Sequence, residues 1–126
     1  MQTLKFESSW DKALSNKDRK AIEATFIKTN TFNNERIQIS PLWQAVNYKN
    51  ELLVTVLLHN FTNHPYSFNE TILGYTEHSK LLAKHTFTIP ALNIPPKTSM
   101  PWTCIFPLES LADVSVLQNG ILTVIR

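Results

Sequence analysis

Three residues in the middle of the chain, His64, His78 and Glu70, have side chains suited to acid–base or metal chemistry. Histidine and carboxylate groups are common zinc ligands and common general acids and bases. His64 and His78 fall in predicted turns at opposite ends of one predicted strand, and Glu70 lies within that strand. We therefore expect solvent-exposed side chains, with a loop-built enzyme or metal site as the alternative. His59, also near a predicted turn, is expected at the surface or at a sheet edge.

Cys104 is the only cysteine, which excludes an intramolecular disulfide. It alternates with Trp102 and Phe106 along an apolar strand face, so we expect a buried structural thiol rather than a nucleophile. The sequence has no Gly-x-Ser-x-Gly nucleophile motif. Its two glycines, Gly74 and Gly120, are too few for a phosphate-binding loop. We expect no catalytic residue, no metal and no cofactor.

The length and charge of the chain indicate one globular domain over residues 1–126, with a net charge of only +2. Its densest basic group contains Lys17, Arg19 and Lys20, but Asp18 interrupts it. This pattern is typical of a solvated helix face, and we expect no nucleic-acid binding. The first residues lack a basic and then apolar leader, and no apolar run reaches about 18 residues. We therefore expect a cytoplasmic protein without a membrane span.

Residues 1–30 are predicted to be helical. Ser15 and Asp18 have the spacing of a capping box, and Ile22 and Phe26, four residues apart, share one helical face. An earlier short helix should begin at Ser8 or Ser9, which yields two short helices or one that breaks at Ser15. Trp10 is expected to anchor this segment to the rest of the protein. A polar linker is predicted for residues 28–35.

From residue 36 onward, apolar residues alternate with a period of two, which predicts strands. Turn signals every 8–12 residues indicate an antiparallel β-sandwich or barrel over residues 36–126, of which we expect the sandwich. The run Leu52–Leu58 is almost continuously apolar and should form a central strand. The fold class is therefore mainly β, with one or two short N-terminal helices. The other predicted strands are Ile37–Val46 (interrupted by Pro41), Tyr66–Tyr75, Leu81–Ile89, Ser99–Phe106 and a hairpin over Val114–Val124.

Side-chain alternation also predicts which residues share a face. In the strand Tyr66–Tyr75, Phe68 and Ile72 are expected on one side, and Leu73 and Tyr75 on the other. In the strand Leu81–Ile89, every second residue starting at Leu81 should lie on one face. Asn119-Gly120 between two β-prone runs predicts a type I′ turn.

The segment Ile94–Pro107 resembles the signature of the SLAP domain. That family comprises small domains of Bacillus-type bacteria, and the domain is duplicated in the S-layer assembly protein of the accessory Sec system. The resemblance covers about residues 4–108. It implies an N-terminal helical piece, an immunoglobulin-like β domain and no catalytic residues. The signature residues are Trp10, Pro95, Pro96, Pro101, Trp102 and Phe106.

The resulting functional hypothesis is a non-enzymatic protein-binding or assembly module, linked to surface-layer protein export. A partner would dock on an exposed strand edge, by adding a strand to the sheet, or on loops. Pro101 and Pro107 block one edge, so the C-terminal hairpin is the candidate. The alternatives are a small enzyme or ligand-binding domain and a structural homodimer.

Overall fold

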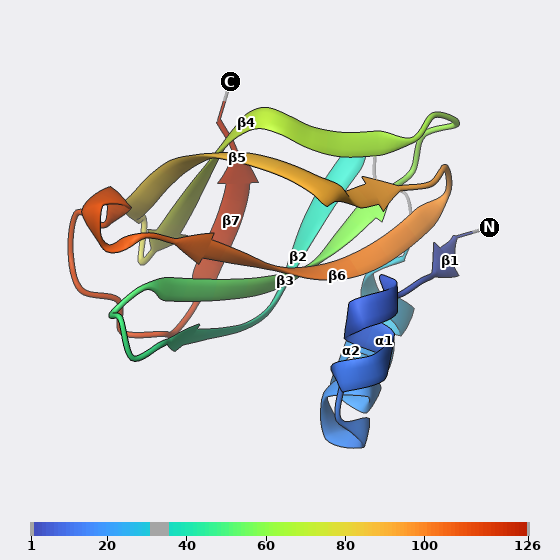
Figure 1. Cartoon of the computed structure of the whole chain (residues 1–126), viewed down its shortest axis with the longest axis horizontal. Coiled ribbons are helices and arrows are strands. Elements are labelled where there is room, and N and C mark those ends of the chain that lie inside the picture. The colour runs from blue at the N-terminus through green and yellow to red at the C-terminus, as the bar shows by residue number, and fades with distance from the viewer. Residues whose placement is uncertain (1, 31–35, 126) are drawn as a thin grey trace.

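Two β-sheets packed face to face form the body of the protein, and two helices stand on the outer side of one sheet (Figure 1). The computed structural model describes residues 2–30 and 36–125. Among these residues, no helix is long and apolar enough to cross a membrane. The elements in chain order are β1 (Thr3–Leu4), α1 (Ser8–Ala13), α2 (Asn16–Thr29), β2 (Ile37–Val46), β3 (Leu52–Asn60), β4 (Tyr66–Glu77), β5 (Lys80–Ile94), β6 (Thr98–Phe106), the 3-10 turn η1 (Leu108–Ser110) and β7 (Gly120–Val124).

The N-terminal helices form where the sequence predicts them. α1 begins at Ser8, and α2 begins directly after Ser15, whose Oγ accepts a hydrogen bond from the Asp18 N–H at 3.1 Å. The chain therefore forms two helices rather than one. α2 continues to Thr29, so the predicted start of the linker at residue 28 is wrong. The remainder of that linker, residues 31–35, lies outside the described part of the chain.

The first sheet has the strand order β1-β6-β3-β2, and β3 is paired on both sides. This confirms the prediction of a central strand at Leu52–Leu58. An apolar run without alternation fits a strand that is covered on both faces. Pro41 does not end β2. The strand continues to Val46, with a register shift between Pro41 and Trp43.

The second sheet has the order β5-β4-β7, and β4 is irregular. The predicted division of β4 into two faces is wrong, since Phe68, Leu73 and Tyr75 are all buried in the core. Register shifts between Ser67 and Thr71 explain the error. Glu70, with φ of 51°, lies in this irregularity and changes which side the later residues face.

The predicted face of β5 is also wrong at its start. Leu81 is 47% exposed, whereas Leu82 is buried and the predicted alternation holds only from Ala83. A register shift between Tyr75 and Thr76 on the neighbouring strand accompanies this change. Alternation in one strand cannot reveal an irregularity in its partner, which explains the error.

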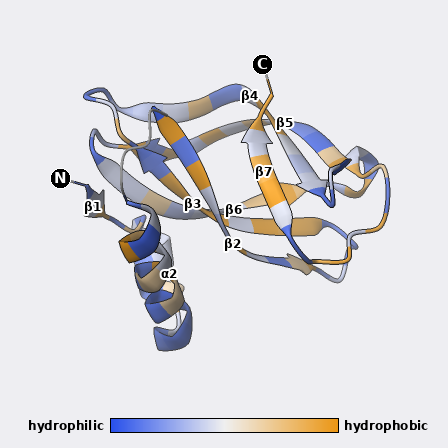
Figure 2. Cartoon of the chain, turned by 180° about the vertical axis from the view of Figure 1, so that it is seen from behind, coloured by the Kyte–Doolittle hydropathy of each residue, from blue (hydrophilic) through white to orange (hydrophobic). Residues whose placement is uncertain are grey.

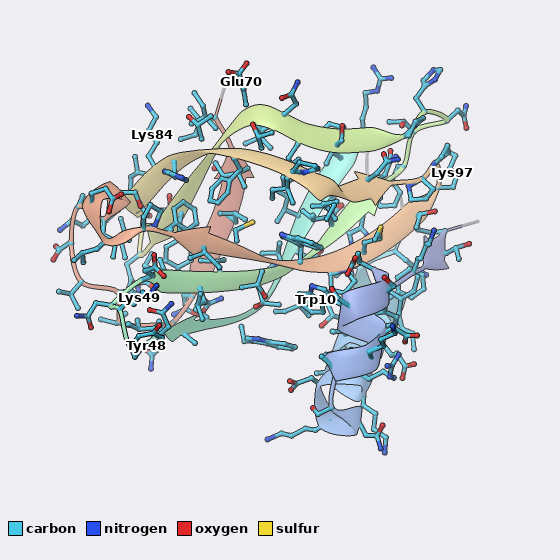
Figure 3. All side chains as sticks on the ribbon, in the orientation of Figure 1. Trp10, Tyr48, Lys49, Glu70, Lys84 and Lys97 are labelled. Atoms are coloured by element: carbon cyan, nitrogen blue, oxygen red, sulfur yellow. The ribbon has the colours of Figure 1, made fainter. Side chains whose placement is uncertain are left out.

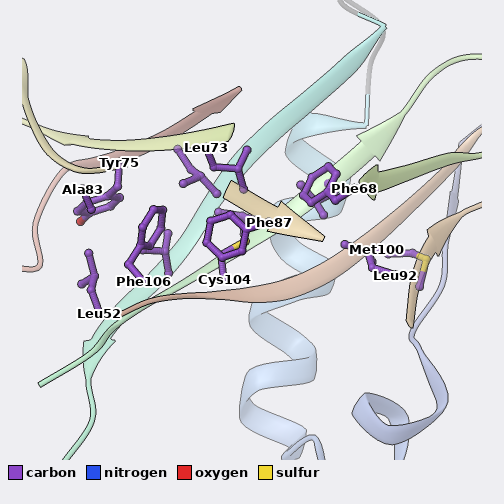
Figure 4. Close-up of a cluster of buried hydrophobic side chains, with 14 of the residues drawn as sticks. Leu52, Phe68, Leu73, Tyr75, Ala83, Phe87, Leu92, Met100, Cys104 and Phe106 are labelled. Carbon is purple, nitrogen blue, oxygen red and sulfur yellow. The ribbon is translucent and has the colours of Figure 1, made fainter. Parts of the chain in front are cut away.

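The core lies between the two sheets, and aromatic rings dominate one end of it (Figure 4). Phe106 of β6 meets Phe87 of β5 edge to face, with ring centroids 5.2 Å apart. Figure 2 shows apolar residues alternating with polar ones along β2. The buried core residues are Leu52, Val54, Val56, Leu58, Phe68, Leu73, Tyr75, Leu82, Ala83, Phe87, Leu92, Ile94, Met100, Cys104, Phe106 and Leu122.

The strand order is that of an immunoglobulin-like sandwich. β2, β3 and β6 occupy the positions of strands A, B and E, and β5, β4 and β7 those of strands C′, C and F. The chain crosses between sheets after β3, β5 and β6, as that topology requires. The predicted fold class is confirmed. Within the described residues, no strand occupies position G beside β7.

The predicted C-terminal hairpin does not form. Only β7 is a strand, and it pairs with β4 rather than with residues 114–118. The carboxylate of Glu77 accepts hydrogen bonds from the N–H groups of Val116 and Leu117, at 2.9 and 3.1 Å. These backbone donors are therefore satisfied by a side chain, which holds the segment as a loop instead of a strand.

Candidate functional site

The three residues first considered for chemistry do not come together. His64 lies in the β3–β4 loop and His78 in the turn after β4, at opposite ends of that strand. Glu70 is exposed on β4 and points away from the sandwich (Figure 3). Within the described residues, no group of three His, Cys, Asp or Glu side chains is placed to hold a metal ion. No loop-built site is assembled from these residues.

Cys104 is only 1% exposed, and it faces the core as its alternation with Trp102 and Phe106 predicts. Burial raises the pKa of its thiol to about 12. The thiolate that nucleophilic or redox chemistry requires is therefore disfavoured at neutral pH.

The proline-rich segment forms a corner of the sandwich. Pro95 and Pro96 lie in the short connection from β5 to β6. Pro101 lies within β6, and Phe106 ends that strand in the core. Proline in a strand is tolerated at an edge, where its missing N–H breaks no ladder bond. β6 is such an edge over much of its length, because β1 pairs only with Thr98 and Ser99.

Trp10 joins the helices to this segment. Its ring stacks on Trp102 of β6, with centroids 6.3 Å apart and planes 29° apart. Figure 3 shows Trp10 on α1, beside the sandwich. The two signature tryptophans therefore contact each other across 92 residues of sequence, which no local pattern reveals.

Replacing Trp10 with alanine should lower the free energy of unfolding by about 2 kcal/mol, because a half-buried stacking partner is lost. Urea denaturation followed by circular dichroism measures this change. Tyr48→Ala is the matched control, since Tyr48 is 90% exposed and its loss should cost less than about 0.5 kcal/mol. Equal stabilities of the two variants would contradict an anchoring role for Trp10.

His59 lies in strand β3 and is fully buried, so the expectation of a surface or edge histidine is wrong. Its Nδ1 lies 2.6 Å from Ser99 Oγ and its Nε2 2.8 Å from Thr29 Oγ1. The ring stacks on Phe61 and on Phe26 of α2, at centroid distances of 5.4 and 6.5 Å. The period of two along β3 could have indicated this burial, because His59 is two residues after Leu57 and lies on the same face of the strand.

Glu77 at the end of β4 is a second buried polar centre that sequence reasoning missed, and it is 3% exposed. Its carboxylate accepts hydrogen bonds from the Tyr75 and Ser115 hydroxyls and from two backbone N–H groups. Burial by itself would raise the pKa of Glu77, but these hydrogen bonds outweigh burial and hold the pKa below its usual value. The group anchors the loop before β7.

A shallow groove of about 290 Å³ lies where the two sheets meet at β5 and β6. β5 is the edge of its sheet, and β6 has no partner beyond Ser99 on its outer side among the described residues. Nearer the start of β5, an antiparallel β-bridge between Ala83 and Leu111 covers the outer edge of this strand. The groove is mainly apolar and hydroxyl-bearing, and its lining residues are His85, Thr86, Phe87, Thr88, Ile89, Trp102, Thr103, Cys104 and Ile105.

The fold and these surfaces define a small immunoglobulin-like β-sandwich that carries a helical pair on one sheet. A family model described as SLAP domain matches residues 4–121. The chain belongs to the SLAP domain family. The comparisons with curated proteins and with solved structures give no match.

Proposed function

We propose that this protein is a non-enzymatic binding module that holds an extended segment of a partner protein. The groove between β5 and β6 carries the proposal. It presents two neighbouring strand edges, and only a peptide backbone can pair with a row of unpaired N–H and C=O groups. Since Pro101 removes a donor from β6, the residues of β5 from His85 to Ile89 are the better pairing edge.

The chemistry of the groove suggests what the bound segment contains. Its lining includes no acidic, lysine or arginine side chain, so charge does not select the partner. Phe87, Trp102 and Ile105 favour apolar side chains, and the threonines favour hydroxyls. On the family membership we propose a partner in surface-layer protein export or assembly, met on the cytoplasmic side of the membrane.

A pull-down with the tagged full chain tests this function. The bait is incubated with lysate from a surface-layer-forming bacterium that has SLAP-domain proteins, and bound proteins are identified by mass spectrometry. We expect wild type to retain a Sec-associated or surface-layer protein, and Ile105→Lys to lose at least about tenfold of it. Val46→Lys is the matched control, because Val46 is 47% exposed and Ile105 48%.

Two outcomes would overturn the proposal. One is recovery of no Sec-associated or surface-layer protein by the wild-type bait. The other is equal recovery of the partner by wild type and by Ile105→Lys, which would show that the partner binds outside the groove. A rise in Tm on adding Zn²⁺ would instead support the ligand-site alternative.

A further inference from the structure

The last part of the chain carries an unusual surface. Residues 114–125 contain no charged side chain. Four of their apolar residues are nevertheless exposed: Val114 by 83%, Val116 by 58%, Leu117 by 39% and Ile121 by 56%. Exposed apolar side chains within one uncharged stretch of chain are typical of an interaction site.

β7 lies in this stretch and is the outer strand of its sheet, with β2 of the other sheet next to it across the sandwich. Among the described residues it pairs only with β4. Native edges are usually protected by proline, lysine or a bulge. Pro41 lies in β2, Pro90 in β5 and Pro101 in β6, whereas β7 has no proline, no charge and no register shift. β7 is thus the edge best able to accept another strand.

The hydrogen bonds to β4 determine which groups of β7 are available. The Ile125 N–H donates to the Ile72 carbonyl at 2.8 Å, which makes these residues a hydrogen-bonded pair of the antiparallel ladder. Such pairs alternate along a ladder, so Ile121 and Thr123 also bond to β4. The N–H and C=O groups of Gly120, Leu122 and Val124 therefore point outward from the edge.

We propose that β7 pairs antiparallel with β7 of a second copy about a twofold axis through Leu122. Leu122 would then exchange both backbone hydrogen bonds with its own counterpart, and Gly120 would bond with Val124 of the other copy. Ile121 and Thr123 would lie opposite each other in non-hydrogen-bonded pairs. The two sheets join into one six-stranded sheet, β5-β4-β7-β7-β4-β5.

Self-pairing suits this strand for two reasons. A twofold interface requires a surface that complements itself. The five residues of β7 meet this requirement, because alternate residues direct backbone N–H and C=O groups outward and no charged side chains repel each other. Val116 and Leu117 are exposed in the loop that leads to Gly120, so the second copy covers additional apolar surface there. The contact is small, and we expect a dissociation constant on the order of 10⁻⁵ M.

This inference does not depend on the proposed function, because β5 and β7 are opposite edges of one sheet. Sedimentation velocity of the full chain over about 10⁻⁶ to 10⁻³ M should show a reversible monomer–dimer equilibrium. The variant Ile121→Lys/Thr123→Lys places four lysines on one face of the paired strands and should weaken dimerisation at least tenfold, to about 10⁻⁴ M or more. Ile105→Lys is the control and should dimerise like wild type.

Disulfide trapping tests the register. Mixing Ile121→Cys with Thr123→Cys should give the mixed disulfide in excess over both symmetric ones, because residues in non-hydrogen-bonded pairs have Cα atoms about 4.5 Å apart. Cys104 is buried and should stay unreactive. A monomer at all concentrations would overturn the proposal. The proposal would also be overturned if the double lysine variant had the wild-type Tm and still dimerised like wild type. Equal yields of the mixed and the symmetric disulfides would overturn it as well.

Discussion

Lowering the pH from about 7 to about 4 is expected to destabilise the folded protein by about 3 kcal/mol through His59 alone. Burial lowers the pKa of His59 from 6.5 to about 4. Between these two values the unfolded chain binds a proton that the folded protein does not. The contribution of His59 is therefore fully present above pH 6.5 and is lost as the pH falls toward about 4.

The hydrogen bonds around His59 explain why the neutral ring is required. The Thr29 hydroxyl donates to the Thr25 carbonyl at 2.7 Å, so its oxygen accepts from His59 Nε2–H. Nδ1 is then the acceptor and the Ser99 hydroxyl the donor. A proton on Nδ1 would oppose that donor and place a charge between Phe26 and Phe61.

The variant His59→Gln separates this contribution from other titrating groups. Urea denaturation at about pH 7.5 and about pH 4.5 should show a much smaller difference in the variant than in wild type. His64→Gln, which replaces an exposed histidine, should keep the wild-type difference. An unchanged pH dependence in His59→Gln would contradict the assignment.

Replacing Glu77 with alanine is expected to cost about 3–5 kcal/mol of unfolding free energy, among the largest effects of a single substitution here. The change leaves the fully buried Tyr75 hydroxyl without its carboxylate partner. It also deprives the N–H groups of Val116 and Leu117 of their acceptor. The loop before β7 would lose its anchor, and β7 would become easier to detach from β4.

Chemical denaturation and hydrogen exchange measure this effect. Glu109→Ala removes an exposed carboxylate and should change stability by less than about 0.5 kcal/mol. Glu77→Gln keeps the shape and should be intermediate. Because the folded pKa of Glu77 is lowered, its contribution is present above the ordinary value of 4.5 and is lost as the pH falls through the lower folded pKa. A Glu77→Ala protein as stable as Glu109→Ala would refute the anchoring role.

Much of the fold is predictable from local patterns. The cap at Ser15, the central strand from Leu52 and the buried face of Cys104 all follow from neighbours along the chain. Errors arise where a partner strand or a distant side chain decides the conformation. The register shifts beside Phe68 and the loop held by Glu77 are such cases.

A mainly β fold with one or two N-terminal helices, and the resemblance to the SLAP domain, could be predicted from the residues alone, because caps, alternation and proline positions are short-range signals. The burial of polar groups, the open sheet edges and the contacts across the sheets follow only from the packing of the strands and helices against one another. His59 and Glu77 show why: each is stabilised by partners 30 to 40 positions away in the sequence. The open edge of β7 likewise depends on which strands lie beside it, and pairing between strands is not a local property.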